Sequence, residues 1–220
     1  MNEITIVRHG ETLWNKLGKA QGFLDSELTE LGKKQAELVG IALQNEKVDF
    51  IYSSDLGRAV KTAEIISTQL GLEFKTEEDL RERNFGILQG QTFEQFKKLW
   101  PEEYNLYKSS DPDYIIPSGE SIRQRNERST KCMFKIVKRH PDSNILIVTH
   151  GGILDSIIRT VLEIPLTVKR HFSILNSSTS KFTVTNNEWQ LISWGNVNHL
   201  DNNDNFKKTD HKNCIDSIWR

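Results

Sequence analysis

Cysteine is scarce in this chain of 220 residues, which contains only Cys132 and Cys214. Two thiols cannot build a disulfide framework or a four-cysteine zinc site. Long apolar runs are also lacking: the longest covers residues 145–148, whereas a membrane-spanning helix needs roughly 20 apolar residues. The chain does not open with the basic and then apolar segment that is typical of a secretory leader. We therefore expect a cytoplasmic protein that binds no membrane.

The chain also lacks an excess of either charge. Lys and Arg number 29 against 30 Asp and Glu, which gives a formal net charge of −1 at pH 7. This balance argues against nucleic acid as the ligand, because proteins that bind the phosphate backbone usually carry a basic excess. A local basic pocket is still compatible with this overall charge balance. Apolar residues make up 36% of the chain, which is enough to build a globular core.

Three short runs of β-branched and aromatic residues predict buried strands, at residues 4–7, 48–52 and 145–148. Continuous apolar runs are typical of strands that are covered on both faces. A helical pattern follows each run along the chain. Strands that alternate with helices indicate an α/β fold, here a three-layer sandwich with a mostly parallel central sheet flanked by helices.

Apolar residues recur at helical spacing in three segments, near residues 28–42, 56–70 and 154–162. Thr29 and Asp55 are candidate N-caps of the first two helices, because their side-chain oxygens can accept hydrogen bonds from free backbone N–H groups.

Two further elements are expected in the second half of the chain. A helix is predicted over about residues 120–139. Residues 181–185 and 188–193 have the pattern of a β-hairpin that turns at Asn186 and Asn187.

The length predicts one domain over residues 1–200. Within it, residues at about 91–118 carry aromatic side chains and prolines, which indicates short helices and loops that form a cap-like insertion. Residues 201–220 are polar and are interpreted as a loosely held tail. Arg123 and Arg125 could bind a second anionic group of a ligand, but arginines on an exposed helix face usually do not.

Residues that can take part in catalysis or ligand binding follow the ends of the three predicted strands. Arg8 and His9 follow the first strand, Arg58 comes soon after the second, and His150 and Gly151 follow the third. Ligands of open parallel sheets bind beyond the carboxyl ends of the strands, so these groups should converge. The glycine after each histidine would let the backbone approach a ligand closely. Two guanidinium groups suit a tetrahedral phosphoryl group, which they can bind bidentately.

These residues are part of a longer series of motifs that runs from residue 4 to about residue 200. In this order, the series resembles the histidine phosphatase superfamily, also called phosphoglycerate mutase-like. The matching segments are RHGETLWN (8–15), Gln21-Gly22, Asp25, LTELG (28–32), SSDLGRAVKTAE (53–64), LRERNFGILQG (80–90), SGES (118–121), Arg128 and IVTHGG (147–152).

The resemblance implies a role for each matching residue. His9 is implied as the nucleophile that accepts the phosphoryl group, and Glu82 as the general acid and later the base. Arg8, Arg58 and His150 are implied to line the phosphate pocket.

Four further residues are implied as substrate-binding donors: Asn15, Gln21, Gly22 and the backbone N–H of Gly151. His199 also resembles a recurrent position of the family, and its role stays open, because a structural histidine fits equally well.

Physical chemistry supports this division of roles. A histidine must attack as neutral imidazole, and the neighbouring guanidinium groups of Arg8 and Arg58 disfavour its protonated form. A carboxyl group beside a phosphate dianion is driven toward protonation, so Glu82 could donate a proton to the departing oxygen. This scheme requires no metal ion and no cofactor. The expected partner is a small-molecule phosphate ester.

The family contains phosphatases and cofactor-dependent phosphoglycerate mutases. Only the 28 residues 91–118 separate Gly90 from Gly119, and mutases of the family usually carry a longer insertion here. We therefore predict a metal-independent phosphomonoesterase. A 2,3-bisphosphoglycerate-dependent mutase and a non-catalytic module that binds phosphate ligands stay open as alternatives. The oligomeric state also stays open, with a homodimer as one option.

Overall fold

The computed structural model describes residues 1–200; the predicted tail at 201–220, with Cys214, lies outside the described residues. Its centre is a six-stranded sheet with the strand order β3-β2-β4-β1-β5-β6. The pairs β3–β2, β2–β4 and β4–β1 are parallel, whereas β1–β5 and β5–β6 are antiparallel. The strands are β1 (Asn2–Arg8), β2 (Phe50–Ser54), β3 (Phe74–Glu77), β4 (Asn144–Thr149), β5 (Thr179–Thr185) and β6 (Glu188–Asn196). The predicted α/β fold with a mostly parallel central sheet is confirmed.

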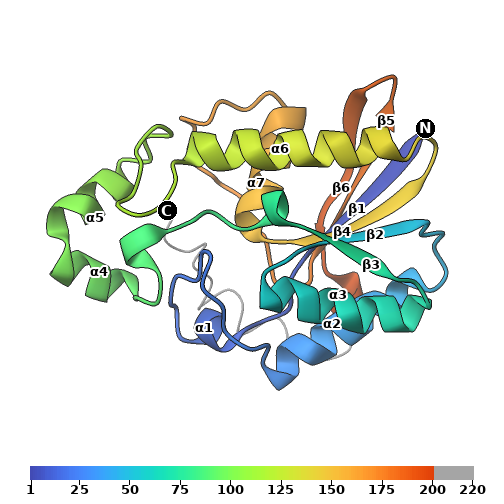
Figure 1. The fold of residues 1–220 in the computed structure, drawn as a ribbon, viewed down its shortest axis with the longest axis horizontal. Helices are drawn as coiled ribbons and strands as arrows, with labels where there is room; N and C mark the ends of the chain where they lie inside the picture. The colour runs from blue at the N-terminus through green and yellow to red at the C-terminus, as the bar shows by residue number, and fades with distance from the viewer. Residues whose placement is uncertain (201–220) are drawn as a thin grey trace.

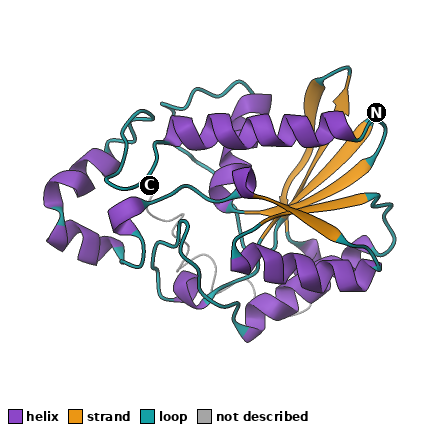
Figure 2. Ribbon diagram, in the orientation of Figure 1, coloured by secondary structure: helices purple, strands orange, loops and turns teal. Residues whose placement is uncertain are grey.

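Helices cover both faces of the sheet (Figures 1 and 2). The long helices are α2 (Glu30–Leu43), α3 (Gly57–Leu70), α6 (Ile122–Arg139) and α7 (Gly151–Val161). Successive side chains of a strand point to opposite faces, so Ile6 packs with Met133 of α6 and Ile157 of α7, whereas Val7 packs with Val39 of α2. The two hydrophobic clusters fix all four helices against the sheet and thereby fix the loops at the strand ends. No helix within residues 1–200 combines the length and the apolar character that a membrane crossing requires.

The N-terminus of α3 differs from the prediction. Asp55 does not cap this helix: its N-cap residue is Leu56, which offers no side-chain hydrogen bond, and Asp55 pairs instead with Arg81. The free N–H of Gly57 donates to the carboxylate of Asp25, which comes from a distant loop. The expected cap of α2 is confirmed, since the hydroxyl group of Thr29 accepts a hydrogen bond from the helix.

The hairpin is confirmed, and one strand was missed. Asn186 and Asn187 have φ values of 53° and 68°, as a two-residue type I′ turn requires. The additional strand β3 lies at the edge of the sheet. Its central residues Lys75 and Thr76 are exposed, so β3 lacks the apolar pattern that predicts a buried strand.

The segment between β3 and α6 forms the short helices η1 (Glu78–Leu80), η2 (Gly86–Leu88), α4 (Phe93–Leu99) and α5 (Pro101–Lys108). Of these, α4 and α5 lie at one end of the molecule (Figure 1). The small helices α1 (Leu13–Lys16) and η3 (Asn198–Leu200) belong to other parts of the chain. Leu88, Phe96, Tyr107 and Ile116 build a separate apolar cluster in this segment. The aromatic side chains predicted for the cap therefore pack mainly against one another.

Candidate active site

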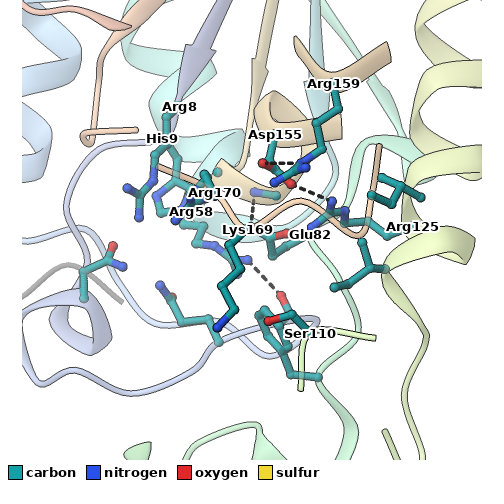
Figure 3. A pocket seen from close by; sticks show the side chains of 18 of the residues that line it. Arg8, His9, Arg58, Glu82, Ser110, Arg125, Asp155, Arg159, Lys169 and Arg170 are labelled. Atoms are coloured by element: carbon teal, nitrogen blue, oxygen red, sulfur yellow. Dashed lines mark hydrogen bonds and ion pairs between the residues drawn. The ribbon is translucent and has the colours of Figure 1, made fainter. Parts of the chain in front are cut away.

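A cleft of about 850 Å³, its open mouth included, lies where β1 and β4 end (Figure 3). Eight of the nine predicted site residues line this cleft: Arg8, His9, Asn15, Gln21, Gly22, Arg58, Glu82 and Gly151. The ninth, His150, lies fully buried beside His9, with their ring centroids 5.2 Å apart. The parallel sheet thus brings together residues that are up to 143 positions apart (Arg8 and Gly151).

His9 is held in a single ring orientation. Its backbone N–H donates to the carbonyl of Thr149 at 2.9 Å, and its ring Nδ1 lies 2.8 Å from the carbonyl oxygen of Gly10. A carbonyl oxygen can only accept, so Nδ1 carries the hydrogen of this bond. In the neutral ring the lone pair is therefore on Nε2, which is the nitrogen that can act as a nucleophile.

The surroundings of His9 keep its ring neutral. Burial is the largest cause that lowers its pKa well below the ordinary value, followed by the charges of Arg58 and Arg8; the hydrogen bond to the Gly10 carbonyl acts in the opposite direction. The sequence predicted the effect of the two guanidinium groups. The larger effect of burial depends on the tertiary structure.

His150 is the N-cap residue of α7 and is 0% exposed. Its Nε2 lies 2.8 Å from the hydroxyl oxygen of Ser54, and its Nδ1 has no hydrogen-bond partner among residues 1–200. The Ser54 oxygen already accepts a bond from the N–H of Leu56, so the serine can donate its own proton to Nε2. Burial and then the charge of Arg58 lower the pKa of His150 well below the ordinary value. Ser54 was not assigned to the site from the sequence.

Arg58 is positioned by the loop that follows α1. Its Nη1 donates to Asp25 at 2.7 Å and to the carbonyl of Leu24 at 2.9 Å, and its Nη2 donates to the carbonyl of Gly22 at 2.8 Å. The Nε atom has no hydrogen-bond partner within residues 1–200. The predicted residue Gly22 therefore acts through its carbonyl on Arg58, which itself lines the cleft. Arg8 is fixed in a similar way by the carbonyl of Ile174.

Asn15 and Gln21 offer amide donors to the cleft. The side-chain oxygen of Asn15 accepts from the N–H of Thr12 at 3.1 Å, and that of Gln21 accepts from Ser26 at 3.1 Å. Both amide oxygens are thus occupied by the protein. The NH₂ groups remain for a ligand, which suits an anion.

The two glycines after the histidines have different surroundings. A Cβ on Gly10 would collide with the backbone carbonyl of Gly32 at the start of α2, so packing requires a glycine at this position. A Cβ on Gly151 would make ordinary contact with Arg8. The role of both glycines in ligand approach stays a prediction.

Glu82 reaches the cleft from the side opposite His9 (Figure 3). Its Oε2 accepts from the N–H of Gly152 at 2.9 Å and its Oε1 from the N–H of Arg83 at 2.8 Å. These two backbone donors fix the carboxylate beside the N-terminus of α7. A carboxylate at this place can exchange a proton with a group bound between it and His9.

A segment that the sequence did not assign to the site holds the His9 backbone. The side-chain amide of Asn176 donates to the carbonyl of His9 at 2.9 Å, and the N–H of Ser177 donates to the carbonyl of Arg8 at 3.0 Å. The ring Nε2 of His199 donates in turn to the carbonyl of Ser177 at 2.9 Å. His199 thus supports the loop that carries His9. The only sequence signal was a group of small polar residues just before a strand.

Arg125 also belongs to the cleft, which corrects our expectation of an exposed helix arginine. Its side chain is 4% exposed and donates to Asp155 at 3.1 Å. Arg123, two positions earlier, is exposed as expected and pairs with Asp113. Residues 123–128 have only polar and charged side chains, so no apolar pattern indicates that Arg125 points inward.

The fold and the cleft together define a class of α/β enzyme in which an imidazole, several cations and a carboxylate surround one cleft. This combination is typical of phosphoryl transfer, in which charge develops on the equatorial oxygens. The family model of the histidine phosphatase superfamily (branch 1) matches residues 4–197. The chain belongs to this superfamily and is a phosphatase-type enzyme.

Several known proteins are similar to this chain. Phosphoglycerate mutase-like protein 4 of Arabidopsis thaliana is 40% identical over 203 residues, which cover 90% of this chain and 87% of the relative. A metal-independent phosphoserine phosphatase of the same plant is 37% identical over 203 residues, 91% of this chain and 84% of the relative. The crystal structure of phosphoserine phosphatase from Entamoeba histolytica in complex with 3-phosphoglyceric acid matches with a TM-score of 0.81 and 31% identity, covering 91% of this chain and 100% of that chain.

Proposed function

We propose that the protein is a metal-independent phosphomonoesterase that hydrolyses a small phosphorylated metabolite through a phosphohistidine at His9. The observation that carries this proposal is the ring of His9, whose Nδ1 is bound to the Gly10 carbonyl, so that the lone pair lies on Nε2, and whose pKa burial lowers well below the ordinary value. The other eight predicted residues surround the same cleft or, for His150, lie beside it.

In the first step, Nε2 of His9 attacks phosphorus and the bond from phosphorus to the ester oxygen breaks. Arg8, Arg58 and the Nδ1–H of His150 stabilise the charge on the equatorial oxygens. The alkoxide is a poor leaving group, so Glu82 acts as the general acid and gives it a proton. The products of this step are an alcohol and the phosphohistidine.

In the second step, a water molecule attacks the phosphorus of the phosphohistidine. Glu82, now a carboxylate, removes a proton from this water, and the bond from Nε2 to phosphorus breaks. Inorganic phosphate leaves, and His9 returns to its neutral form. Splitting the displacement into two steps replaces one difficult reaction with two easier ones.

A phosphoglycerate mutase is the second candidate, and the names of several relatives favour it. A mutase must protect its phosphohistidine from water and must bind a second phosphate. The short segment between Gly90 and Gly119 supports the phosphatase instead. A non-catalytic binding module would be expected to lack one of the reacting side chains, whereas His9, Arg58, Glu82 and His150 are all present.

The decisive experiment traps the intermediate. Brief incubation with a ³²P-labelled phosphomonoester should give an acid-labile, base-stable phosphoenzyme, and His9→Ala should abolish the label and lower kcat by at least about 10³-fold. The exposed His171 provides the matched control His171→Ala, which should keep both label and turnover.

Full turnover in His9→Ala would exclude the proposal. A panel of phosphate esters measured with EDTA, and with 3-phosphoglycerate plus 2,3-bisphosphoglycerate, separates the remaining options. Release of inorganic phosphate in EDTA supports the phosphatase, whereas formation of 2-phosphoglycerate without phosphate release identifies the mutase.

A further inference from the structure

Ser54 lies at the carboxyl end of β2, beside the ring of His150 that follows β4. The two strands are parallel neighbours in the sheet, and Ser53 pairs with Val148, so the residues after this pair lie next to each other. The hydroxyl oxygen of Ser54 is 2.8 Å from Nε2 of His150, and both residues are 0% exposed. The sheet therefore gives the buried ring of His150 a hydroxyl group as its neighbour.

The backbone is fixed on both sides of this contact. The carbonyl of His150 accepts from the N–H groups of Ile153 and Leu154, each at 3.1 Å, in the first turn of α7. The carbonyl of Ser54 accepts from the hydroxyl group of Ser53 at 2.8 Å. The distance between the ring and the hydroxyl group is thus set by a strand and a helix, and not by a mobile loop.

The other bonds of Ser54 decide which group donates in this contact. Its oxygen already accepts from the N–H of Leu56 at 3.3 Å. Among residues 1–200, the hydroxyl hydrogen of Ser54 has no acceptor other than Nε2 of His150. Because an unused donor is costly in a buried position, the hydroxyl group donates to Nε2. The neutral ring then carries its own hydrogen on Nδ1.

The position of this hydrogen determines how the ring of His150 meets an anion. Nδ1 is buried and has no hydrogen-bond partner among residues 1–200. With a hydrogen it can donate to an oxygen of a bound anion, whereas the lone pair of the opposite tautomer would repel that oxygen. A buried donor of this kind gains a full hydrogen bond when an oxyanion binds. Ser54 can therefore favour an anion that it does not contact.

We propose that Ser54 is a positioning residue, which holds His150 in the Nδ1–H tautomer and so keeps this ring a hydrogen-bond donor to the phosphoryl group. The inference rests on the proposed function, because it takes the anion to be the phosphoryl group that reacts with His9. The same contact opposes protonation of His150. A charged ring would donate from Nε2 as well, and the hydroxyl hydrogen of Ser54 would lose its acceptor.

Nitrogen NMR locates the hydrogen directly. In protein labelled with ¹⁵N-histidine, the ring shifts of His150, assigned by their absence in His150→Gln, should show a hydrogen on Nδ1. Ser54→Ala should move these shifts toward the opposite or a mixed tautomer. Ser54→Thr keeps the hydroxyl group and should restore them, and Ser54→Cys, of similar size but a weaker donor, should lie between alanine and serine. The control Ser67→Ala truncates a buried serine near the end of α3 and should change nothing.

Binding of inorganic phosphate, measured by calorimetry, connects the tautomer to the site. Ser54→Ala should raise Kd about three- to tenfold, as the loss of one hydrogen bond does, whereas Ser54→Thr and Ser67→Ala should keep the wild-type value. Neither measurement requires turnover, so both are independent of whether an ester is hydrolysed. A hydrogen on Nε2 of His150 in the wild type, or unchanged ring shifts or an unchanged Kd in Ser54→Ala, would overturn the role of Ser54 and leave the reaction at His9 intact.

Discussion

His9 and His150 are buried beside two guanidinium groups, and the pKa of each lies well below that of a free imidazole. In the unfolded chain both rings take up protons near the ordinary value of about 6.5. The unfolded state therefore binds more protons than the folded state below this pH. The burial that favours the neutral, nucleophilic form of His9 therefore also makes the folded protein less stable in acid.

This linkage predicts how stability depends on pH. As the pH falls below about 6.5, the free energy of unfolding should decrease by up to about 1.4 kcal/mol per pH unit for each of the two histidines. His150→Gln removes one titrating group and should reduce the slope between pH 6.5 and 5 by up to that amount. Urea unfolding at several pH values measures it. The same slope in the His150→Gln variant and the wild type would contradict the prediction, and His171→Gln, at an exposed position, serves as the control.

At the scale of the secondary-structure element, the start of α3 connects stability to the phosphate site. The Asp25 carboxylate accepts from the N–H of Gly57, from the N–H of Arg58 at 3.3 Å and from the Arg58 guanidinium at 2.7 Å. One side chain thus caps the helix and orients the cation that faces the phosphoryl group. The resemblance included Asp25 among the matching residues but gave it no role.

A pair of variants tests this double role. Asp25→Ala should destabilise the fold by about 1–2 kcal/mol, as the loss of a helix cap does, and should weaken binding of inorganic phosphate about tenfold. Asp55→Ala removes only a partly exposed ion pair with Arg81 and should cost less than about 1 kcal/mol with phosphate affinity unchanged. Chemical denaturation and calorimetry provide the two measurements. If Asp55→Ala had the larger effect, Asp55 would act as the cap after all.

At the scale of the whole molecule, Arg83 connects the cap to the body. Its guanidinium is almost fully buried, and burial lowers its pKa. Its Nε donates to the carbonyl of Glu120 at 2.8 Å and its Nη2 to the carbonyl of Tyr114 at 3.3 Å, while the guanidinium lies over the Tyr107 ring. Arg83, which follows Glu82, therefore connects Tyr107 of α5 and Tyr114 with Glu120 in the loop before α6.

Loss of this connection should loosen the cap selectively. In Arg83→Met, amide hydrogens of residues 93–108 should exchange at least about tenfold faster, because buried hydrogen bonds from a charged donor are lost. The amides of β1 and β4 should keep their protection. Hydrogen exchange read by mass spectrometry resolves both regions, with Arg123→Met as the control on the exposed face of α6. Uniformly faster exchange would mean that Arg83 stabilises the whole domain and not the cap in particular.

Much of the fold was available from local patterns along the chain. The alternating runs of strand and helix, the cap at Thr29 and the asparagine turn of the hairpin each depend on neighbours in sequence. His9, Arg58 and His150 could be placed together because the carboxyl ends of parallel strands lie at one edge of a sheet. The strand β3 could not be predicted in this way, since an exposed edge strand carries no apolar pattern.

The amino-acid sequence by itself determined the layered architecture and the chemical groups at the strand ends, because periodicity and turn preferences are encoded within a few neighbouring residues. Only the tertiary structure decided that Asp25 and not Asp55 caps α3, and that Arg125 turns inward to Asp155. It also decided that burial is the largest cause of the lowered pKa of His9. The contacts of Asp25 and Arg125 each join residues 30 or more positions apart, and the burial of His9 depends on the whole packed core. Their geometry depends on how the loops and helices pack, and no local pattern in the chain specifies that packing.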